Sequence, residues 1–227
     1  MRSYFTGVIG YVFLVVYLAV GAAVFSYTTL FAMTADVTSF YTYMLLLSAI
    51  ILPLLTMKSF SEERKVKTEQ LLLTAPVSIT GMVFGKFLAA YTMFAGSMLI
   101  NTCYFFLLQP YAYVQYATLF GNFVAILLVG MTFIAVGIFV SALTENQLTA
   151  AVGTIAIIAA FLLIGLVSSL IPSSYAIRYV FNFLSVFTRF QGFAAGYFDI
   201  ASLVYYISIA GIFVYLTIRI YDRRRFG

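Results

Sequence analysis

The sequence has no histidine, no tryptophan and a single cysteine, and it carries few charges. Without histidine, neither a His-Glu-x-x-His metal site nor histidine acid–base catalysis is available. Cys103 lies inside an apolar run and has no second cysteine with which to form a disulfide within the chain. Charged residues make up 8% of the 227 residues, whereas soluble domains carry about 25%. The chain is therefore predicted to be an integral membrane protein.

The apolar stretches also lack charge at their centres. No Asp or Glu lies in the middle of one, which excludes an intramembrane aspartyl pair, a proton relay and a charged ion site. Lysine occurs only at or beyond their ends, so a buried Ser/Lys pair is excluded as well. The segment Gly81–Lys86 is only partly similar to a phosphate loop, because Phe87 replaces the Ser or Thr that binds magnesium. We expect no catalytic residue, cofactor or metal in this chain.

Six stretches are apolar over about the 20 residues that a helix needs to cross a bilayer. They cover about residues 8–31, 40–57, 83–108, 117–143, 148–171 and 200–220. The predicted fold class is an all-α membrane protein with six transmembrane helices. Residues 1–227 are expected to form a single domain, because the sequence has neither a linker nor an internal repeat. The first stretch is too long for a signal peptide and lacks a small-residue cleavage site, so it is expected to remain as a span.

The distribution of basic residues predicts the topology. Six spans put both termini on one side of the membrane. The same side then holds Arg2, the five basic residues of segment 58–86 and the four basic residues of the C-terminal tail. Only Arg178 and Arg189 then lie on the other side, so the positive-inside rule predicts cytoplasmic termini. The net charge of +5 follows from this arrangement. A nucleic-acid binder gathers its basic residues on one polar surface, so we expect the bilayer, and no nucleic acid, as a partner.

The segment 58–86 is the most polar part of the chain. Ser59 and Glu62 have the spacing of a capping box, and Glu63 and Lys67 form an i,i+4 pair, which together predict a short amphipathic helix. A helix of roughly 12 to 15 residues is marginal in water, so it is expected to rest on the membrane surface or on another protein. A solvated cytoplasmic loop is the alternative interpretation.

Two further helix starts are predicted on the cytoplasmic side. Pro76 is expected to end the short helix, and Ser78 to cap the third span. In the second cytoplasmic turn, Thr144 and Gln147 have capping-box spacing, which predicts the start of the fifth span. A helix start alone and a contact with a partner both remain open for this turn.

The outer side contains one long connection, residues 172–199. It is too polar to span the membrane and rich in aromatic residues, among which Tyr179 and Phe183 have helical spacing. We predict an outer re-entrant or interfacial pair of helices between the fifth and sixth spans, broken near Gly192 and Gly196.

Two asparagines lie within the spans. Asn101 in the third span and Asn122 in the fourth are candidates for a substrate path. Hydrogen bonding to neighbouring helices is the alternative role for both side chains.

Motifs along the whole chain carry a resemblance to a known family. The matching residues are Arg2–Thr6 and Ile9–Phe13 at the start, Glu62–Arg64, Thr68-Glu69, Leu71-Leu72, Ala75–Ser78 and Gly85-Lys86 in segment 58–86, Leu143–Gln147 in the second cytoplasmic turn, and Arg223–Arg225 in the tail. With these motifs the sequence resembles the type-2 (ABC-2) permease subunits of ATP-binding-cassette transporters. Within them it is similar to the permeases associated with gliding motility and with nitrous-oxide-reductase maturation.

The resemblance implies a transport subunit, expected to be an exporter, in the inner membrane of a bacterium. Such a permease has no ATPase motif of its own. It pairs with a second permease, identical or related, and with two separate nucleotide-binding subunits that hold ATP and Mg²⁺. The segment from about Ser61 to Leu73 is then the cytoplasmic coupling helix between the second and third spans, seated on an ATPase subunit.

The resemblance also assigns roles to residues. The expected contacts with the ATPase are Glu62, Glu63, Arg64, Thr68, Glu69, Leu71 and Leu72, the residues expected to set the coupling geometry are Pro76, Val77 and Ser78, and the second cytoplasmic turn is Thr144, Glu145, Asn146 and Gln147. Lys67 stands where the family pattern has glycine, so the helix is expected to continue there without a bend. The lead before the first span is short and leaves little room for an amphipathic N-terminal helix.

Two other classes of function are weighed against this interpretation. An ATP-independent channel or ion-coupled carrier would fit the hydrophobicity, but such carriers use paired repeats and broken helices that this sequence lacks. A membrane enzyme acting on lipid lacks a catalytic set. The cargo stays open among lipid-linked glycans, peptides, a cofactor-maturation substrate and a motility-related role.

Overall fold

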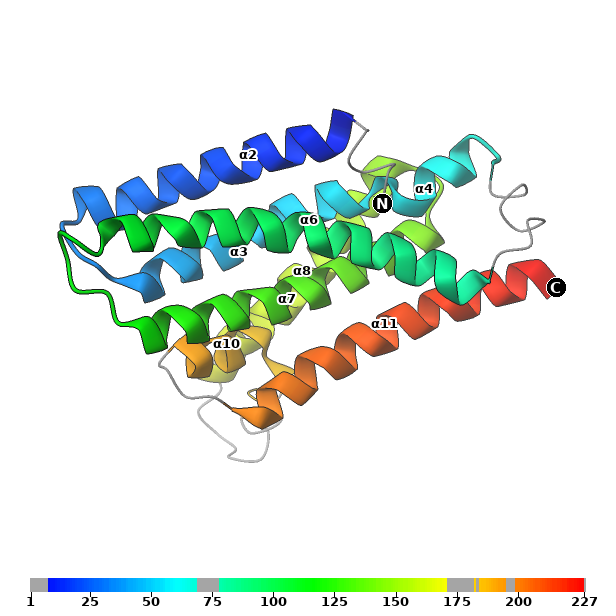
Figure 1. Ribbon diagram of the computed structural model, residues 1–227. Coiled ribbons are helices and arrows are strands. Elements are labelled where there is room, and N and C mark those ends of the chain that lie inside the picture. Colours follow the sequence, from blue (N-terminus) through cyan, green and yellow to red (C-terminus); the bar gives the residue numbers. More distant parts are fainter. Residues whose placement is uncertain (1–7, 69–77, 171–181, 183, 195–198, 227) are drawn as a thin grey trace.

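A computed structural model describes residues 8–68, 78–170, 182, 184–194 and 199–226 (Figure 1). Every regular element in these ranges is a helix, and six of the helices are long and apolar enough to cross a membrane. The predicted all-α class with six spanning helices is therefore confirmed.

The spanning helices lie within a few residues of the predicted ranges. The first consists of α2 (Val8–Phe25) followed by a π-helical segment, η1 (Ser26–Phe31). The other five are α3 (Val37–Thr56), α6 (Ile79–Leu108), α7 (Tyr116–Leu143), α8 (Gln147–Leu170) and α11 (Ile200–Phe226). The last helix is longer than expected, since it continues through the basic tail.

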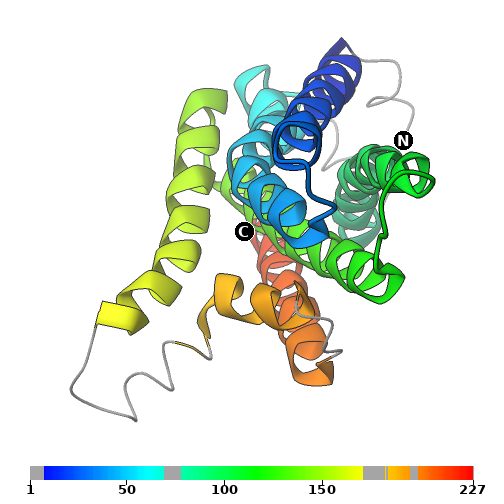
Figure 2. The ribbon, with the colours of Figure 1, turned by 90° about the vertical axis from the view of Figure 1, so that its left-hand side faces the viewer.

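Two short helices lie at opposite ends of this bundle. Figure 1 shows α4 (Lys58–Lys65) at the same end as the C-terminus, and α10 (Val186–Ala194) at the other end. The end-on view in Figure 2 shows α10 beside the bundle, where it packs against α7 and α8. The helix passes Gly192 and ends at Ala194, between the two glycines of the predicted break, and it buries Phe190 and Phe193. Tyr179, Phe183 and Gly196 lie outside the described residues.

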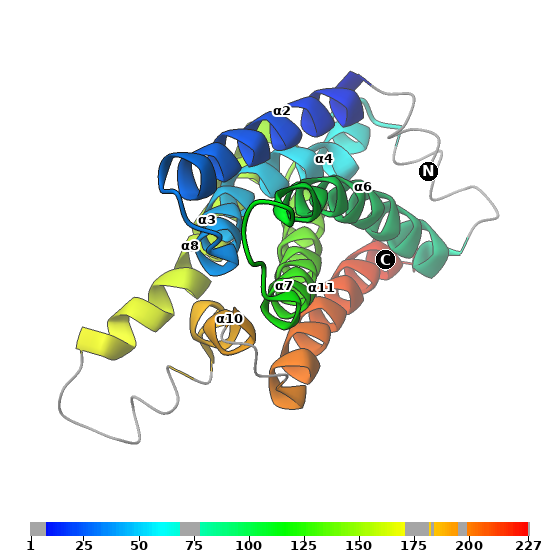
Figure 3. The same ribbon diagram turned by 60° about the vertical axis from the view of Figure 1, so that its left-hand side comes forward.

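The central helix is α7, which contacts α3, α4, α6, α8, α10 and α11 (Figure 3). It is the most deeply buried of the six spanning helices. A helix that is apolar on all sides belongs in such a position, because every face meets another helix or lipid. Lipid tails provide no hydrophobic drive for helix association, so close packing has to hold these helices together.

Polar side chains within the spans add bonds between helices. The Tyr17 hydroxyl on α2 lies 2.9 Å from the Ser48 hydroxyl on α3, and the Tyr41 hydroxyl lies 2.8 Å from that of Thr102 on α6. All four side chains are buried. These bonds join the first three spans in a medium that offers no water to replace them.

The helices α3 and α7 approach each other closely near α4. A Cβ atom built on Gly137 of α7 would lie 2.1 Å from the Thr56 hydroxyl oxygen of α3. Thr56 is β-branched and its hydroxyl donates to carbonyl groups of its own helix, so it has little freedom to turn away. Glycine at position 137 therefore allows the two backbones to approach.

Gly137→Ala is expected to destabilise the protein by roughly 1–3 kcal/mol, because the added methyl group forces α3 and α7 apart. Gly96→Ala is the matched control, since a Cβ atom at Gly96 would meet nothing within 4 Å. Alanine is there expected to stabilise the helix by roughly 0.5–1 kcal/mol. Thermal unfolding of both variants in one detergent provides the measurement. Equal melting temperatures for the two variants would contradict the close approach.

Candidate functional site

The α4 helix continues α3 without a separate start. Met57 between them keeps helical angles, φ −54° and ψ −32°, and no side chain caps α4. The predicted Ser59/Glu62 capping box is therefore wrong, and Ser59 is instead a buried residue within α4. Residues Val37–Lys65 form one helical stretch of 29 residues. A displacement of α4 thus acts directly on α3.

Ser141 of α7 holds the start of α4. Its hydroxyl oxygen accepts hydrogen bonds from the backbone N–H groups of Phe60 at 3.0 Å and Ser61 at 3.1 Å. The same hydroxyl donates to the Met57 carbonyl at 3.0 Å. A buried backbone N–H group that lacks a hydrogen-bond partner is costly. One serine therefore satisfies the backbone at the point where α3 passes into α4.

Arg64 joins the other end of α4 to the turn between α7 and α8. Its guanidinium donates to the Leu143 carbonyl at 3.0 Å and to the Glu145 carboxylate at 2.8 Å. Arg224 of α11 donates to the neighbouring Ala142 carbonyl at 2.9 Å. The last carbonyls of a helix lack partners within it and carry the negative end of its dipole. Two arginines, from α4 and α11, therefore cap the end of α7.

Lys86 joins α6 to the same helix. Its ammonium group lies 2.5 Å from both the Glu63 carboxylate and the Ser59 carbonyl, and 3.9 Å from the centre of the Phe60 ring. The predicted pairing of Glu63 with Lys67 is therefore wrong. The Lys86 and Glu63 side chains are 18% and 29% exposed, so the ion pair is partly buried. Removing one partner would leave a charge that water only partly solvates.

Phe60 provides the apolar contact of α4. Its ring is fully buried and lies 4.7 Å, centre to centre, from the Tyr221 ring of α11. The group of contacts that joins α4 to α6, α7 and α11, and α11 to the end of α7, is called the α4 clamp below. Its residues are Phe60, Glu63, Arg64, Lys86, Ser141, Glu145, Tyr221 and Arg224.

The helix ends much earlier than predicted. It stops at Lys65, a turn follows, and Lys67 has a φ of 60°. The expectation that the helix continues through Lys67 to Leu73 is wrong, because this left-handed conformation cannot extend an α-helix and is the one that glycine favours. Lys67 thus takes the conformation to which the glycine of the family pattern is suited. Residues 69–77, which include the predicted site residues Glu69, Leu71, Leu72, Pro76 and Val77, lie outside the described residues.

An exposed tip remains beyond the clamp. We define it as Glu62, Lys65, Val66 and Lys67, all of which are exposed. Val66 is 64% exposed although it is apolar. Thr68 is half-buried, and its hydroxyl donates to the Glu63 carbonyl at 3.3 Å. The tip therefore presents one apolar side chain between charged ones.

The neighbouring helix starts are capped as follows. Ser78 caps α6, because its hydroxyl accepts from the Gly81 N–H group at 3.3 Å, which confirms the predicted cap. In the turn between α7 and α8, the Thr144 hydroxyl bonds back to the Val140 carbonyl and ends α7, while Asn146 accepts from the Leu148 N–H group and starts α8. The predicted Thr144/Gln147 capping box is therefore wrong, since Asn146 performs that role.

The two asparagines lie in different helix interfaces. Asn101 is buried against Gly21 of α2, where an added Cβ atom would lie 2.2 Å from its amide oxygen. Neither polar atom of the Asn101 side chain has a hydrogen-bond partner among the described residues. Asn122 donates to the carbonyls of Thr118 at 2.8 Å and Ala194 at 3.3 Å, which joins α7 to α10. The structure does not bring the two together, and a substrate role for either stays a prediction.

Comparison with known proteins gives the family. The sequence matches the family described as ABC-2 family transporter protein over residues 22–218. The chain belongs to this family. Comparison with curated protein sequences finds no match. The resemblance to ABC-2 permeases is thereby confirmed, while the narrower likeness to gliding-motility and nitrous-oxide-reductase-maturation permeases stays a prediction.

Membership in the ABC-2 family defines the role of the chain in coarse terms. It is the membrane subunit of an ATP-binding-cassette transporter, not itself the ATPase, and it associates with ABC ATPase subunits. The α4 clamp lies at the end of the permease where the short polar helix α4 extends beyond the spanning helices. Sequence reasoning missed Ser141, Lys86 and Tyr221 as partners of α4 and Arg224 as a partner of α7. The signal in the sequence was their position at span ends.

Ser141→Ala is expected to loosen the start of α4. The N–H groups of Phe60 and Ser61 would stay buried without their partner, which costs about 1–3 kcal/mol. Hydrogen–deuterium exchange in a peptide that covers both residues should become faster. Ser97→Ala is the control, since Ser97 is equally buried but bonds only to Phe94 of its own helix. Unchanged exchange at Phe60 and Ser61 in the Ser141 variant would show that the serine does not hold α4.

Proposed function

We propose that this permease is the transport subunit of an ATP-driven exporter and that α4 is its coupling helix. In this proposal two separate ATPase subunits bind ATP and Mg²⁺, and a second permease, identical or related, completes the membrane part. Both termini and α4 face the cytoplasm of a bacterium. The positive-inside rule supports this orientation, because Lys58, Lys65, Lys67 and Arg223–Arg225 gather at the α4 end of the bundle.

The observation that carries the proposal is the α4 clamp. A flexible loop on an ATPase would absorb force by bending, whereas α4 is continuous with α3 and bonded to α6, α7 and α11. Packed helices respond to force by moving as bodies, not by gradual deformation. Force applied to α4 is therefore passed to the central helix α7 as well as to the second and third spans.

The clamp changes which residues are assigned to the ATPase contact. Glu63 and Arg64 already pair with Lys86 and Glu145 inside the permease, so we assign them to holding α4 in place. Among the described residues, the exposed tip with Val66 at its centre is then the surface of α4 that is available to enter a cleft on the ATPase. ATP binding draws the two ATPases together, the tip moves with them, and the path between the two permeases opens.

Val66→Asp tests the docking surface. A charge at the centre of an apolar contact is expected to weaken the complex with the ATPase at least about tenfold, which corresponds to 1.4 kcal/mol. The measurement is the amount of co-expressed ATPase that copurifies with the tagged permease. Tyr113→Asp is the control, since Tyr113 is 91% exposed and lies in the connection at the opposite end. Equal retention of ATPase by both variants would contradict docking at α4, and transport without nucleotide would favour a channel or carrier.

Lys86→Met tests the transfer of force. The ATPase should still bind, but the spans should respond less to ATP, because Glu63 then loses its link to α6. Cys103 is the single cysteine and is exposed on α6, so a fluorophore attached there reports movement of this helix. Lys58→Met is the control, since Lys58 forms no ion pair among the described residues. An ATP-dependent signal that is equal in both variants would contradict transfer through the clamp.

A further inference from the structure

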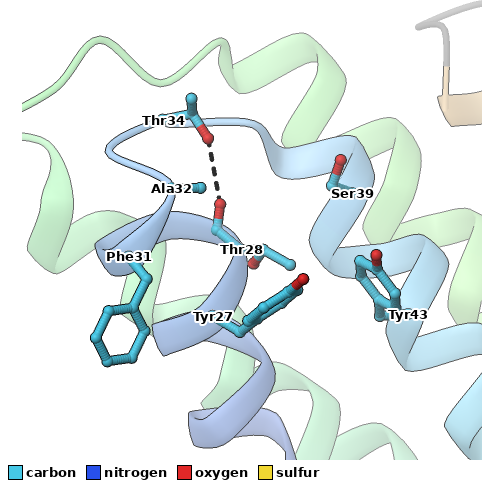
Figure 4. Close-up of a pocket in the computed structure, with 7 residues that line it drawn as sticks. All are labelled: Tyr27, Thr28, Phe31, Ala32, Thr34, Ser39 and Tyr43. Carbon is cyan, nitrogen blue, oxygen red and sulfur yellow. Dashed lines mark hydrogen bonds between the residues drawn. The ribbon is translucent and has the colours of Figure 1, made fainter.

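A pocket of about 360 Å³ lies where the first span ends and α3 begins, at the end of the bundle away from α4 (Figure 4). Tyr27, Thr28 and Phe31 of η1 line one side of it, and Ser39 and Tyr43 of α3 line the other. The Tyr27 and Tyr43 rings are nearly perpendicular, at 83°, with their centres 6.2 Å apart. Two aromatic rings therefore border one open space.

The backbone around this pocket departs from regular helix in two places. The six residues Ser26–Phe31 form a π-helix, a rare geometry that often occurs at functional sites. In the turn that follows, Met33 has a φ of 52°, which is costly for a residue other than glycine. The Thr34 hydroxyl holds this turn by donating to the Thr28 carbonyl at 3.2 Å. Crossing the membrane requires neither irregularity, whereas together they give the pocket its shape.

The pocket offers hydroxyl groups in two different states. The phenol groups of Tyr27 and Tyr43 have no hydrogen-bond partner among the described residues, so they are available as donors and acceptors. The hydroxyl groups of Thr28, Thr34 and Ser39 already donate to Val24, Thr28 and Asp36, and their oxygens remain as acceptors. A ligand that both donates and accepts hydrogen bonds fits this lining.

The charges near the pocket exclude an anionic group. None of its lining residues is Lys or Arg, so a phosphate would lack a counterion. The Asp36 carboxylate next to it would repel an anion, and it is already engaged by the Ser39 hydroxyl at 2.5 Å and the Thr38 N–H group at 2.9 Å. A phosphate is therefore disfavoured, and the hydroxyl-rich lining fits a neutral group that itself carries several hydroxyl groups.

We propose that this pocket binds a neutral sugar at the membrane surface. Sugar hydroxyls donate to the Thr and Ser oxygens and accept from the two phenols, while the C–H face of the sugar ring packs on Tyr27 or Tyr43. The sugar comes from a glycolipid headgroup or from a saccharide in solution, since both present the same chemistry. This site involves neither α4 nor ATP, so the test of sugar binding is independent of the test of the proposed function.

Phe31→Trp provides the probe for this site. The chain has no other tryptophan, and Phe31 is 83% exposed, so the larger ring fits without repacking the bundle. The protein is placed in nanodiscs of phosphatidylethanolamine and phosphatidylglycerol, because a maltoside detergent would itself present a sugar. One titration adds maltose to the solution, and a second adds diglucosyl-diacylglycerol to the nanodisc. A saturable change in tryptophan emission is expected in at least one titration, and the titration that responds identifies the source of the sugar.

Removal of the tyrosine rings then tests whether this pocket is the binding site. In the Phe31→Trp background, Tyr27→Leu and Tyr43→Leu should each raise the half-saturating concentration about three- to tenfold, which is the range expected for loss of one aromatic contact. Tyr43→Phe keeps the ring and should have a smaller effect. Tyr215→Leu is the control, since this exposed tyrosine lies on α11 and does not line the pocket. No saturable change in either titration would overturn the proposal, and so would a change that survives loss of both tyrosine rings.

Discussion

The arrangement around α4 depends on a single constraint, the need of the carbonyl groups at the end of α7 for hydrogen-bond partners. The last carbonyls of a helix have no partner within it. Arg64 and Arg224 supply the donors for Leu143 and Ala142. Because one arginine comes from α4 and the other from α11, meeting this need also joins those helices to the centre of the bundle.

The magnitudes show which contacts of the α4 clamp hold it together. The Arg64–Glu145 pair is exposed on its acidic side, with the Glu145 side chain 72% exposed, and pairs of this kind contribute about 0.2–1 kcal/mol. Bonds that satisfy buried backbone groups matter more, because an unmade one costs about 1–3 kcal/mol. Ser141 serves two N–H groups and one carbonyl at once. The neutral serine, more than the exposed ion pair, therefore fixes α4 on α7.

The sequence was sufficient for the parts of the fold that depend on length and composition. Six spans follow from apolar stretches and a scarcity of charge, and the Ser78 cap follows from a local bond three residues long. The capping box at Ser59 failed because Met57 stays helical and the packing of α3 against α7 carries the helix past that point. The bonds to Ser141 join residues about 80 positions apart, and no local pattern encodes such a contact.

The positive φ angle of Lys67 is a second feature that could not be predicted from the sequence. A lysine in a polar segment predicts continued helix by its intrinsic propensity, but the turn after α4 requires a left-handed residue at that position. Intrinsic propensity along this segment therefore does not show where α4 ends.

The two ends of α7 are held by different kinds of contact, and the contacts near α4 have a mechanical consequence. Near α4, Gly137 lies so close to Thr56 that no Cβ atom fits, and Ser141 and Arg64 bond across the same interface. At the other end, the link between α7 and α10 that passes through Asn122 is a single longer bond of 3.3 Å. A displacement of α4 therefore has to move α7 with it, because the two helices are joined directly by hydrogen bonds.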